Sequence, residues 1–362
     1  MQHREISTFH IVFFFMMGTG LLNHVIIIPP LLDTARRDAW LSVILSFFVF
    51  LIWALVIFYL VRATSQQNLH VWLETAIGKP VAYVFSGTII LYLLVIAATT
   101  LKDLTMWTYV TYLPRTPQVI IMGTFLLLCL SLAHTSIRTI AIVNGILLPI
   151  VLFLGFFAAT SNLPKKDYTL LTPLFEFGYM PVLQGMIYAC AGLFEIIVIL
   201  FLQHHVKTKI NYWSLVIIGL ILTWLTLGPT TGAIATFGPT KASELRFPAF
   251  EQWALVSLSR YVEHLDFLSV YQWLSGAFIR ISLALFIISD LLQLADKKRR
   301  WLLWAAGLCI LGVNLIPIND MQFIYMLARY ILPGSLLYTI SLAVLLSLLV
   351  TVFKRRGYHH DI

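Results

Sequence analysis

Long apolar stretches separated by short polar segments dominate this sequence. A helix that spans a membrane needs about 20 predominantly apolar residues, and ten stretches meet or approach that length. Charged residues interrupt the sixth and the eighth, so their apolar pattern is weaker. We predict transmembrane helices over residues 6–32, 39–61, 80–109, 117–134, 139–160, 179–204, 212–231, 267–294, 301–319 and 329–353.

The composition requires lipid around most of the chain. Hydrophobic residues make up 60% of the 362 residues and charged residues only 11%, and the mean hydropathy is +0.89. A soluble domain carries about 25% charged residues, so this chain has too few charges to cover a water-facing surface. No long polar linker divides it. The sequence therefore predicts an all-α membrane protein with a single integral membrane domain over residues 1–362.

Arginine and lysine residues predict the orientation in the membrane. The chain has 24 of them against 16 acidic residues, mostly between the apolar stretches. An even number of spans puts both termini on one side of the membrane. That side then carries 13 Lys and Arg residues against 9 on the other, and the basic runs at 297–300 and 354–356 contribute most to the excess. Cytoplasmic loops are enriched in these residues, so we predict cytoplasmic termini. No basic face with stacking aromatic residues is visible, which makes the lipid bilayer, and not a nucleic acid, the expected partner.

Two connecting segments have a helical pattern of their own. Residues 65–79 predict a short interfacial helix on the cytoplasmic side, because apolar side chains recur at helical intervals at Leu69, Trp72, Leu73 and Ala76. Residues 233–266 mix apolar and charged positions at helical spacing from Phe250 onward. We expect an outer cap here with at least one amphipathic helix, and an ordinary solvated loop is the alternative.

Glycines lie near the middles of the first and the sixth expected helix. Residues 17–21 read Met-Gly-Thr-Gly-Leu and residues 189–193 read Ala-Cys-Ala-Gly-Leu. Glycine weakens a helix by roughly 1 kcal/mol relative to alanine, and glycine-broken spans in corresponding positions are typical of transporter sites at the membrane midplane. We predict a LeuT-like inverted 5+5 repeat with broken helices one and six, the repeats covering about 6–160 and 179–353. The alternative is that the glycines only allow close helix packing.

Such breaks would suit a zwitterionic ligand. Backbone N–H groups that follow residues 18–20 would point into a cavity and favour a carboxylate. Carbonyl groups freed near residues 189–194 would accept hydrogen bonds from an ammonium group. An amino acid or a similar zwitterion carries both groups.

Few ionisable residues lie deep in the apolar stretches, namely Lys102, Asp103, Glu195, Arg280 and Asp290. A charge at the bilayer centre costs at least about 2.5–3.5 kcal/mol, so these side chains should face the bundle interior and pair. We predict that Glu195 pairs with Arg280, or in second place with Lys102, in a gating role or as a purely structural ion pair. Asp290 is ten residues from Arg280, about 15 Å along a helix, and should lie near the cytoplasmic end.

Motifs for catalysis and metal binding are not apparent. The sequence has no P-loop, no HExxH and no GxSxG pattern, which argues against an enzyme and predicts neither catalytic residues nor a cofactor. His204-His205 and His359-His360 lie at or beyond span ends and lack the i, i+4 spacing of a helical metal site. We expect these side chains to be solvated and predict no metal site.

Four segments resemble one known family, the GerB-type B subunits of spore germinant receptors, within the amino acid–polyamine–organocation superfamily. They are ISTFHIVFFFMMGTGLL at 6–22, YACAGLFEIIVIL at 188–200, LRFPAFE at 245–251 and VYQWLSGAFIRISLALF at 270–286. The last two, in this order after a seventh span, are the more specific. The resemblance covers essentially the whole chain.

The resemblance implies an outer cap around Phe247-Pro248 and a substrate cavity at Gly18, Thr19, Gly20, Ala191, Gly192 and Glu195. It further implies nutrient sensing in the inner membrane of dormant endospores, in a complex with an A subunit and a lipoprotein C subunit. This sequence departs from the family pattern at His10, where members often have Gln, and at Arg280, where they often have Lys. The alternative functions are a secondary amino acid transporter coupled to H⁺ or Na⁺ and, with least support, a membrane-embedded enzyme.

Overall fold

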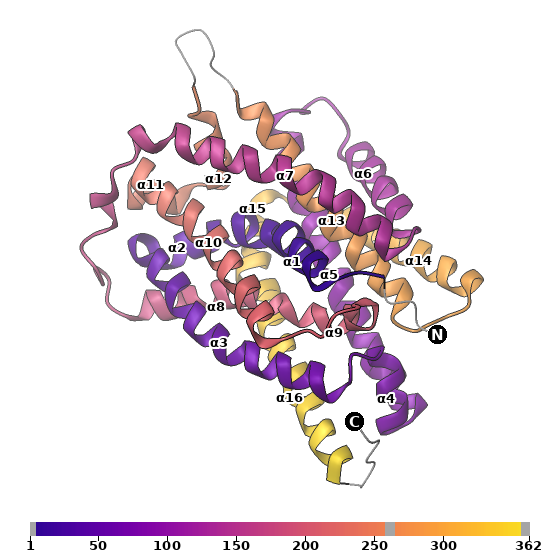
Figure 1. Ribbon diagram of the computed structural model, residues 1–362. Coiled ribbons are helices and arrows are strands. Elements are labelled where there is room, and N and C mark those ends of the chain that lie inside the picture. Colours follow the sequence, from indigo (N-terminus) through magenta and orange to yellow (C-terminus); the bar gives the residue numbers. More distant parts are fainter. Residues whose placement is uncertain (1–4, 258–264, 356–362) are drawn as a thin grey trace.

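The computed structural model describes residues 5–257 and 265–355, and within these residues it contains helices and no β-strand (Figure 1). Seven helical segments are long and apolar enough to cross a membrane, which confirms the prediction of a multi-pass all-α membrane protein. They are Thr8–Ala63, Lys79–Thr111, Ile137–Ser161, Met180–His205, Tyr212–Phe237, Leu265–Asp290 and Asp320–Val352.

The first of these segments has 56 residues and covers two of the ten expected spans. The chain turns at Arg36, whose φ of 48° lies in the left-handed region, and this turn separates α2 from α3. In chain order the segment comprises α1 (Thr8–Phe14), π-helical turns at Phe15–Thr19 and Leu22–Ile26, α2 (Ile28–Ala35), a 3-10 turn at Arg36–Asp38 and α3 (Ala39–Ala63).

The other expected spans also coincide with helices, although two of these are not among the seven. Helix α6 (Gln118–Ala133) is apolar but short, and α14 (Asp296–Asn314) begins with a run of charged residues. The remaining long elements are α5 (Lys79–Thr111), α7 (Ile137–Ser161), α8 (Met180–Phe194) with α9 (Ile199–Leu202), α10 (Tyr212–Phe237), α13 (Leu268–Asp290), and α15 (Asp320–Met326) with α16 (Leu332–Arg355).

Short helices occupy both of the patterned connecting segments. Helix α4 (Leu69–Ile77) lies within 65–79 as predicted, and the side chain of Asn68 caps it by accepting a hydrogen bond from the Val71 N–H at 3.2 Å. Helices α11 (Pro239–Glu244) and α12 (Pro248–Ala254) lie within 233–266, so that segment is not an ordinary loop. The part of the expected amphipathic helix at 258–264 falls outside the described residues.

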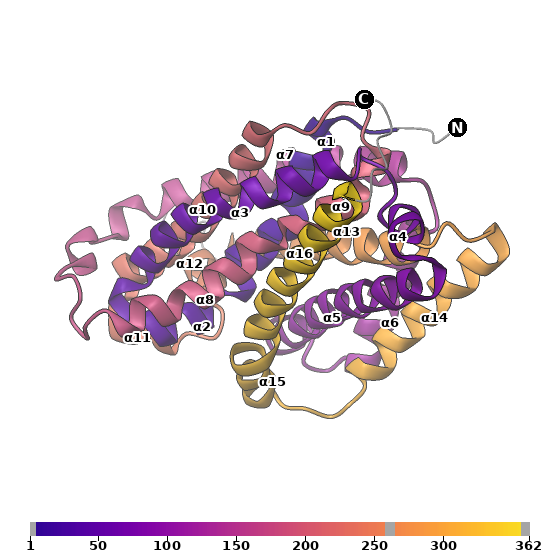
Figure 2. The same cartoon turned by 90° about the horizontal axis from the view of Figure 1, so that it is seen from below.

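Two spans lie at the centre of the bundle. In the most apolar windows of Met180–His205 and Leu265–Asp290, 83% of the residues are buried, against 28–50% in the other five spans. Helix α8 packs against α3 and α2, and α13 packs against α5, α6, α7 and α14. Figure 2 shows α3, α8 and α10 running beside one another on one side of the molecule. These central spans correspond to the sixth and eighth of the ten stretches predicted from the sequence, and their charges are possible because protein and not lipid surrounds them.

Candidate functional site

The backbone changes its helix type at the glycine-containing parts of the first and the sixth span. Residues Phe15–Thr19 form a π-helical turn that includes Gly18, and α8 gives way to a 3-10 turn at Glu195–Val198, just after Gly192. The predicted unwinding is therefore wrong for these residues, because both segments remain helical. π-Helical turns within α-helices are frequent at functional sites.

The glycines allow very close contact between neighbouring spans. A Cβ atom on Gly18 would lie at an ordinary contact distance, 3.5 Å from the Arg280 Cα, whereas one on Gly20 would lie 3.1 Å from the Leu225 Cδ1. A Cβ atom on Gly192 would lie 2.9 Å from the Asn23 Cγ, closer than real Cβ atoms come. Close packing, the alternative considered for these glycines, is thus what the surroundings of Gly20 and Gly192 show.

Glu195 and Arg280 form a buried ion pair at this contact. Arg280 Nη1 donates to Glu195 Oε1 at 2.5 Å and Nη2 donates to Oε2 at 2.6 Å, a paired arrangement that fixes both side chains. The side chain of Arg280 is 5% exposed and that of Glu195 is 6% exposed. Thr19 Oγ1 donates to Glu195 Oε1 at 2.8 Å, so the first, sixth and eighth spans all contribute to the pair.

A backbone and a hydroxyl oxygen accept two further hydrogen bonds from the guanidinium. Arg280 Nε donates to Thr100 Oγ1 at 3.0 Å, and Nη1 also donates to the Gly18 carbonyl at 3.2 Å. A buried charge is tolerated when its remaining hydrogen-bonding groups are satisfied in this way. Thr100 brings the third span into the site, and it was missed in the sequence because hydroxyl groups are common in membrane helices.

Two further side chains missed in the sequence hold the surrounding backbone. Asn23 Nδ2 donates to the Thr19 carbonyl at 2.9 Å and Asn23 Oδ1 accepts from Thr226 at 3.1 Å. Trp53 Nε1 donates to the Phe194 carbonyl at 3.3 Å, and the two rings stack with centroids 4.3 Å apart. The carbonyl groups beside the ion pair are therefore already occupied by protein donors.

A cavity of about 30 Å³ borders the ion pair. This volume holds one or two water molecules and is too small for an amino acid, so the site is closed in this conformation. Three of the six predicted substrate-binding residues line it, whereas Gly20, Ala191 and Gly192 do not. The lining residues are Phe14, Phe15, Gly18, Thr19, Leu93, Ile96, Glu195, Val198, Leu202, Arg280, Leu283, Ala284 and Ile287.

Lys102, the second predicted partner of Glu195, lies elsewhere. Its Nζ donates to the carbonyls of Asn314 and Ile316 at 3.1 and 3.4 Å, at the C-terminal end of α14. Unpaired carbonyls at a helix end attract a cation, and this explains why the lysine does not turn toward the carboxylate.

Asp103 joins an ion-pair network that sequence reasoning missed. Arg246, between α11 and α12, bonds through Nη2 to Asp103 at 2.8 Å and through Nε to Asp320 at 2.9 Å. Its guanidinium also lies 4.2 Å from the centre of the Phe247 ring. The segment with α11 and α12 is thereby tied to the third span and to the start of α15. The sequence signal for this network was the LRFPAFE segment, which contains Arg246, although it did not indicate that Arg246 would contact Asp103 and Asp320.

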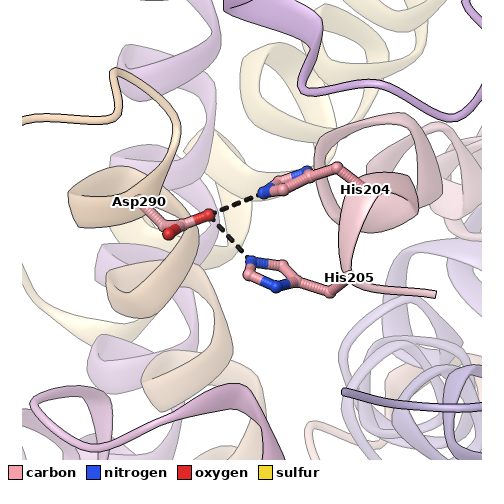
Figure 3. Close-up of side chains that lie close together, drawn as sticks. All are labelled: His204, His205 and Asp290. Carbon is pink, nitrogen blue, oxygen red and sulfur yellow. Dashed lines mark hydrogen bonds and ion pairs between the residues drawn. The ribbon is translucent and has the colours of Figure 1, made fainter. Parts of the chain in front are cut away.

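The two adjacent histidines are not solvated, contrary to the prediction. His204 Nε2 and His205 Nε2 each lie 2.9 Å from Asp290 Oδ2 (Figure 3). Their side chains are 3% and 15% exposed, and that of Asp290 is 16% exposed. The sixth span ends in a 3-10 turn at Gln203–His205, and both rings in this turn contact Asp290, the last residue of α13. As predicted, Asp290 does not pair with Arg280 within the described residues.

This fold and its buried charges define a multi-pass helical membrane protein with a polar centre, and comparison with known proteins gives its family. The chain belongs to the family described as Spore germination protein, which matches residues 4–323. It is 42% identical to Spore germination protein XB of Bacillus anthracis over 353 residues, 97% of this chain and 99% of that protein. The Putative spore germination protein YfkT of Bacillus subtilis (strain 168) is 24% identical over 267 residues, 71% of each chain. The resemblance inferred from the four segments is confirmed, and the chain is a germination-related, permease-like membrane protein.

Proposed function

We propose that this chain is the integral membrane subunit of a spore germinant receptor and that it binds a small nutrient, an amino acid, between its first, sixth and eighth spans. The ion pair of Glu195 and Arg280 beside the cavity is the observation that supports this proposal. It places one negative and one positive group, both buried, at a point where the first, third, sixth and eighth spans meet.

A zwitterion is the ligand that such a pair selects. Removal of one partner of a buried pair leaves an uncompensated charge and costs about 3–5 kcal/mol. An amino acid supplies both replacements at once, because its carboxylate can take the two parallel bonds of Arg280 and its ammonium group can bind Glu195. Uncharged sugars and simple ions replace at most one partner, so they do not open the pair.

Opening of the pair provides the signal in this proposal. The closed cavity is too small for the ligand, so binding requires the three spans to separate. A ligand that binds the open state better than the closed state shifts the population toward it. In this proposal, an A subunit and a lipoprotein C subunit in the inner membrane of the endospore detect the change in conformation.

The proposal includes the topology that this role requires. This topology has ten spans, cytoplasmic termini and a LeuT-like 5+5 repeat whose halves are residues 6–160 and 179–353. In such an arrangement the ion pair lies near the membrane midplane. Support comes from the ten helical segments at the expected places and from the Lys and Arg distribution. The segment with α11 and α12 is then an outer cap.

The test is ligand binding to the purified full-length chain in nanodiscs, followed by thermal unfolding with amino acids, nucleosides and sugars. We expect one amino acid to raise Tm, since a ligand at a hundred times its Kd stabilises by about 2.7 kcal/mol. The increase should be lost in Arg280→Gln and kept in Arg138→Gln, an exposed arginine at the start of α7 that serves as the matched control. A shift caused only by uncharged nutrients, or one unchanged in Arg280→Gln, would overturn the ion-pair site. Robust amino acid uptake by proteoliposomes of this chain alone would replace the receptor with a transporter.

A further inference from the structure

Two polar contacts connect the sixth span with the eighth, about ten residues apart along both helices. The first is the ion pair of Glu195 and Arg280. The second is the cluster of His204, His205 and Asp290, which we call the histidine cluster. Asp290 lies ten residues after Arg280, and the histidines lie nine and ten residues after Glu195. The histidine cluster is therefore a second connection between the same two helices, separate from the nutrient site.

The three side chains present the ligand atoms of a metal site. The potential ligand atoms of the cluster all lie within 4.8 Å of one another. Both imidazole rings direct Nε2 at the same carboxylate oxygen, as Figure 3 shows. Zinc binds imidazole nitrogen and carboxylate oxygen at about 2.0–2.2 Å in tetrahedral geometry, with neighbouring ligand atoms about 3.3 Å apart. The observed N···O separations of 2.9 Å are within a few tenths of an ångström of that requirement.

The surroundings leave space for exchange of an ion with solvent. His204 is nearly buried, whereas His205 and Asp290 are partly exposed at 15% and 16%. Three protein ligands leave a fourth position for water, as in many zinc sites that are not fully closed. Two imidazoles and one carboxylate favour divalent first-row transition metals over Ca²⁺ and Mg²⁺, which prefer oxygen ligands.

We propose that His204, His205 and Asp290 bind a divalent transition metal ion, with Zn²⁺ as the best fit. The ion replaces the hydrogen bonds between the imidazoles and the carboxylate, and it joins the end of the sixth span to the end of the eighth. The start of the chain is attached to the same point, because the N–H groups of Glu5 and Ile6 donate to the His205 carbonyl at 2.9 and 3.1 Å. The three spans that carry Thr19, Glu195 and Arg280 are thus held together at one end.

The experiment is a metal titration of the full-length chain, purified without a polyhistidine tag. His359 and His360 are replaced by alanine in all proteins, so that the terminal histidine pair does not bind the ion. Zn²⁺ binding is measured calorimetrically, and Co²⁺ is used as a probe because its visible absorption reports nitrogen and oxygen ligands. We expect one ion per chain. Asp290→Asn and His205→Gln should each weaken binding at least tenfold, whereas Asp290→His should retain it because an imidazole replaces the carboxylate.

The matched control is His70→Gln, which removes a buried histidine that bonds to Ser86 at 2.8 Å in another part of the bundle. Its metal affinity should equal that of the background protein. Monodisperse elution and unchanged helix content identify variants that fold. Absence of a specific Zn²⁺ or Co²⁺ site in the folded background protein would overturn the proposal. Equal binding by Asp290→Asn and the background protein would overturn it as well, as would failure of Asp290→His to bind.

Discussion

At the scale of single residues, the buried guanidinium of Arg280 determines which substitutions the bundle tolerates. It donates to Glu195, Thr100 and the Gly18 carbonyl, and so it contacts three other spans. Burial removes water from both charges, and only their mutual contact and these additional bonds offset that loss. The pair therefore contributes more to the specificity of the closed arrangement than to net stability.

A double-mutant cycle tests this pairing. Glu195→Gln and Arg280→Gln should each lower the free energy of unfolding by about 3–5 kcal/mol, because each leaves one buried charge without its partner. The double variant should lose less than the sum, since it removes both charges. Unfolding in detergent micelles gives the values, and Glu244→Gln, at an exposed carboxylate, is the control. Additive losses would show that the two side chains do not interact energetically.

Gly192 tests the close approach of the first and sixth spans. Gly192→Ala should destabilise by about 1–3 kcal/mol, as overpacking does, because the new Cβ would meet the Asn23 amide. Gly192→Leu should be worse and should abolish the ligand-induced rise in Tm while leaving membrane insertion intact. Gly312→Ala is the matched control, since among the described residues no atom outside its own stretch of helix lies within 4 Å of a Cβ there.

Asn23→Ala in the Gly192→Ala background identifies the cause of that effect. It removes the obstructing amide, so the double variant should be more stable than the sum of the single changes predicts. Strict additivity, measured by the same thermal unfolding, would mean that the helix itself and not the contact with Asn23 requires glycine at this position.

The sequence predicted the ion pair because a charge in an apolar stretch has few possible partners. It did not predict the histidine cluster, because adjacent residues on a regular helix point in different directions. The two imidazoles lie in the 3-10 turn at Gln203–His205 that ends the sixth span, and not in a regular α-helix. Asn23 and Thr100 were missed for another reason: an amide or hydroxyl group in a membrane helix gives no sign of its partner.

At the scale of helices, two spans that carry buried charges, the sixth and the eighth, are the most buried. A span surrounded by protein needs no continuous apolar surface, so the sixth and eighth can carry the charges that a lipid-facing helix cannot. The sequence did not show, however, whether the glycine-containing segments of the first and sixth spans would unwind or stay helical. Glycine indicates where a helix is weak, but neighbouring helices decide whether it unwinds or changes to π or 3-10 geometry.

The network around Arg246 holds the segment with α11 and α12 on the bundle. Asp103→Asn should destabilise by about 3 kcal/mol, because this carboxylate is 1% exposed and its loss leaves Arg246 poorly compensated. Asp320→Asn should cost at most about 1 kcal/mol, because Asp320 is 40% exposed and solvent screens the contact. Hydrogen exchange of α11 and α12 reports the effect, and Lys241→Gln is the exposed control. Equal effects of the two aspartate changes would contradict this ranking.

At the scale of the whole molecule, the sequence indicated the span boundaries closely in the first half of the chain and less closely in the second, where α10 ends at Phe237 and not at 231, and α14 begins at Asp296 and not at 301. The number of crossings is the harder question. Helices α3 (Ala39–Ala63) and α5 (Lys79–Thr111) begin and end within two residues of the predicted limits, 39–61 and 80–109. The first and last residues of such a span can be predicted from the sequence, because polar residues mark where its apolar stretch begins and ends. Helices α6 and α14 differ, since neither has the length and apolar character of the seven clear spans. Their packing against α13 places them in the bundle, and ten crossings require both to traverse the membrane.

Accessibility of single cysteines decides this point. In a Cys309→Ser background, which removes the exposed native thiol, Ala295→Cys and Met321→Cys flank α14, and Leu113→Cys and His134→Cys flank α6. Ten spans with cytoplasmic termini predict that an impermeant thiol reagent labels positions 113 and 321 in intact cells. Positions 134 and 295 should react only after permeabilisation.

The labelling pattern separates the orientation of the protein from the number of crossings, because each changes the accessibility of the four cysteines in a different way. Reversed orientation exchanges the labelling of all four positions, whereas a helix that does not cross gives its two flanking positions the same accessibility. If α14 fails to cross, position 321 shares the side of position 295, and the ion pair of Glu195 and Arg280 no longer lies within a 5+5 arrangement. If both helices cross and positions 134 and 295 are protected in intact cells, the Lys and Arg residues at 297–300 lie in the cytoplasm on the same side as the histidine cluster, which places the proposed metal site at the cytoplasmic end of the bundle.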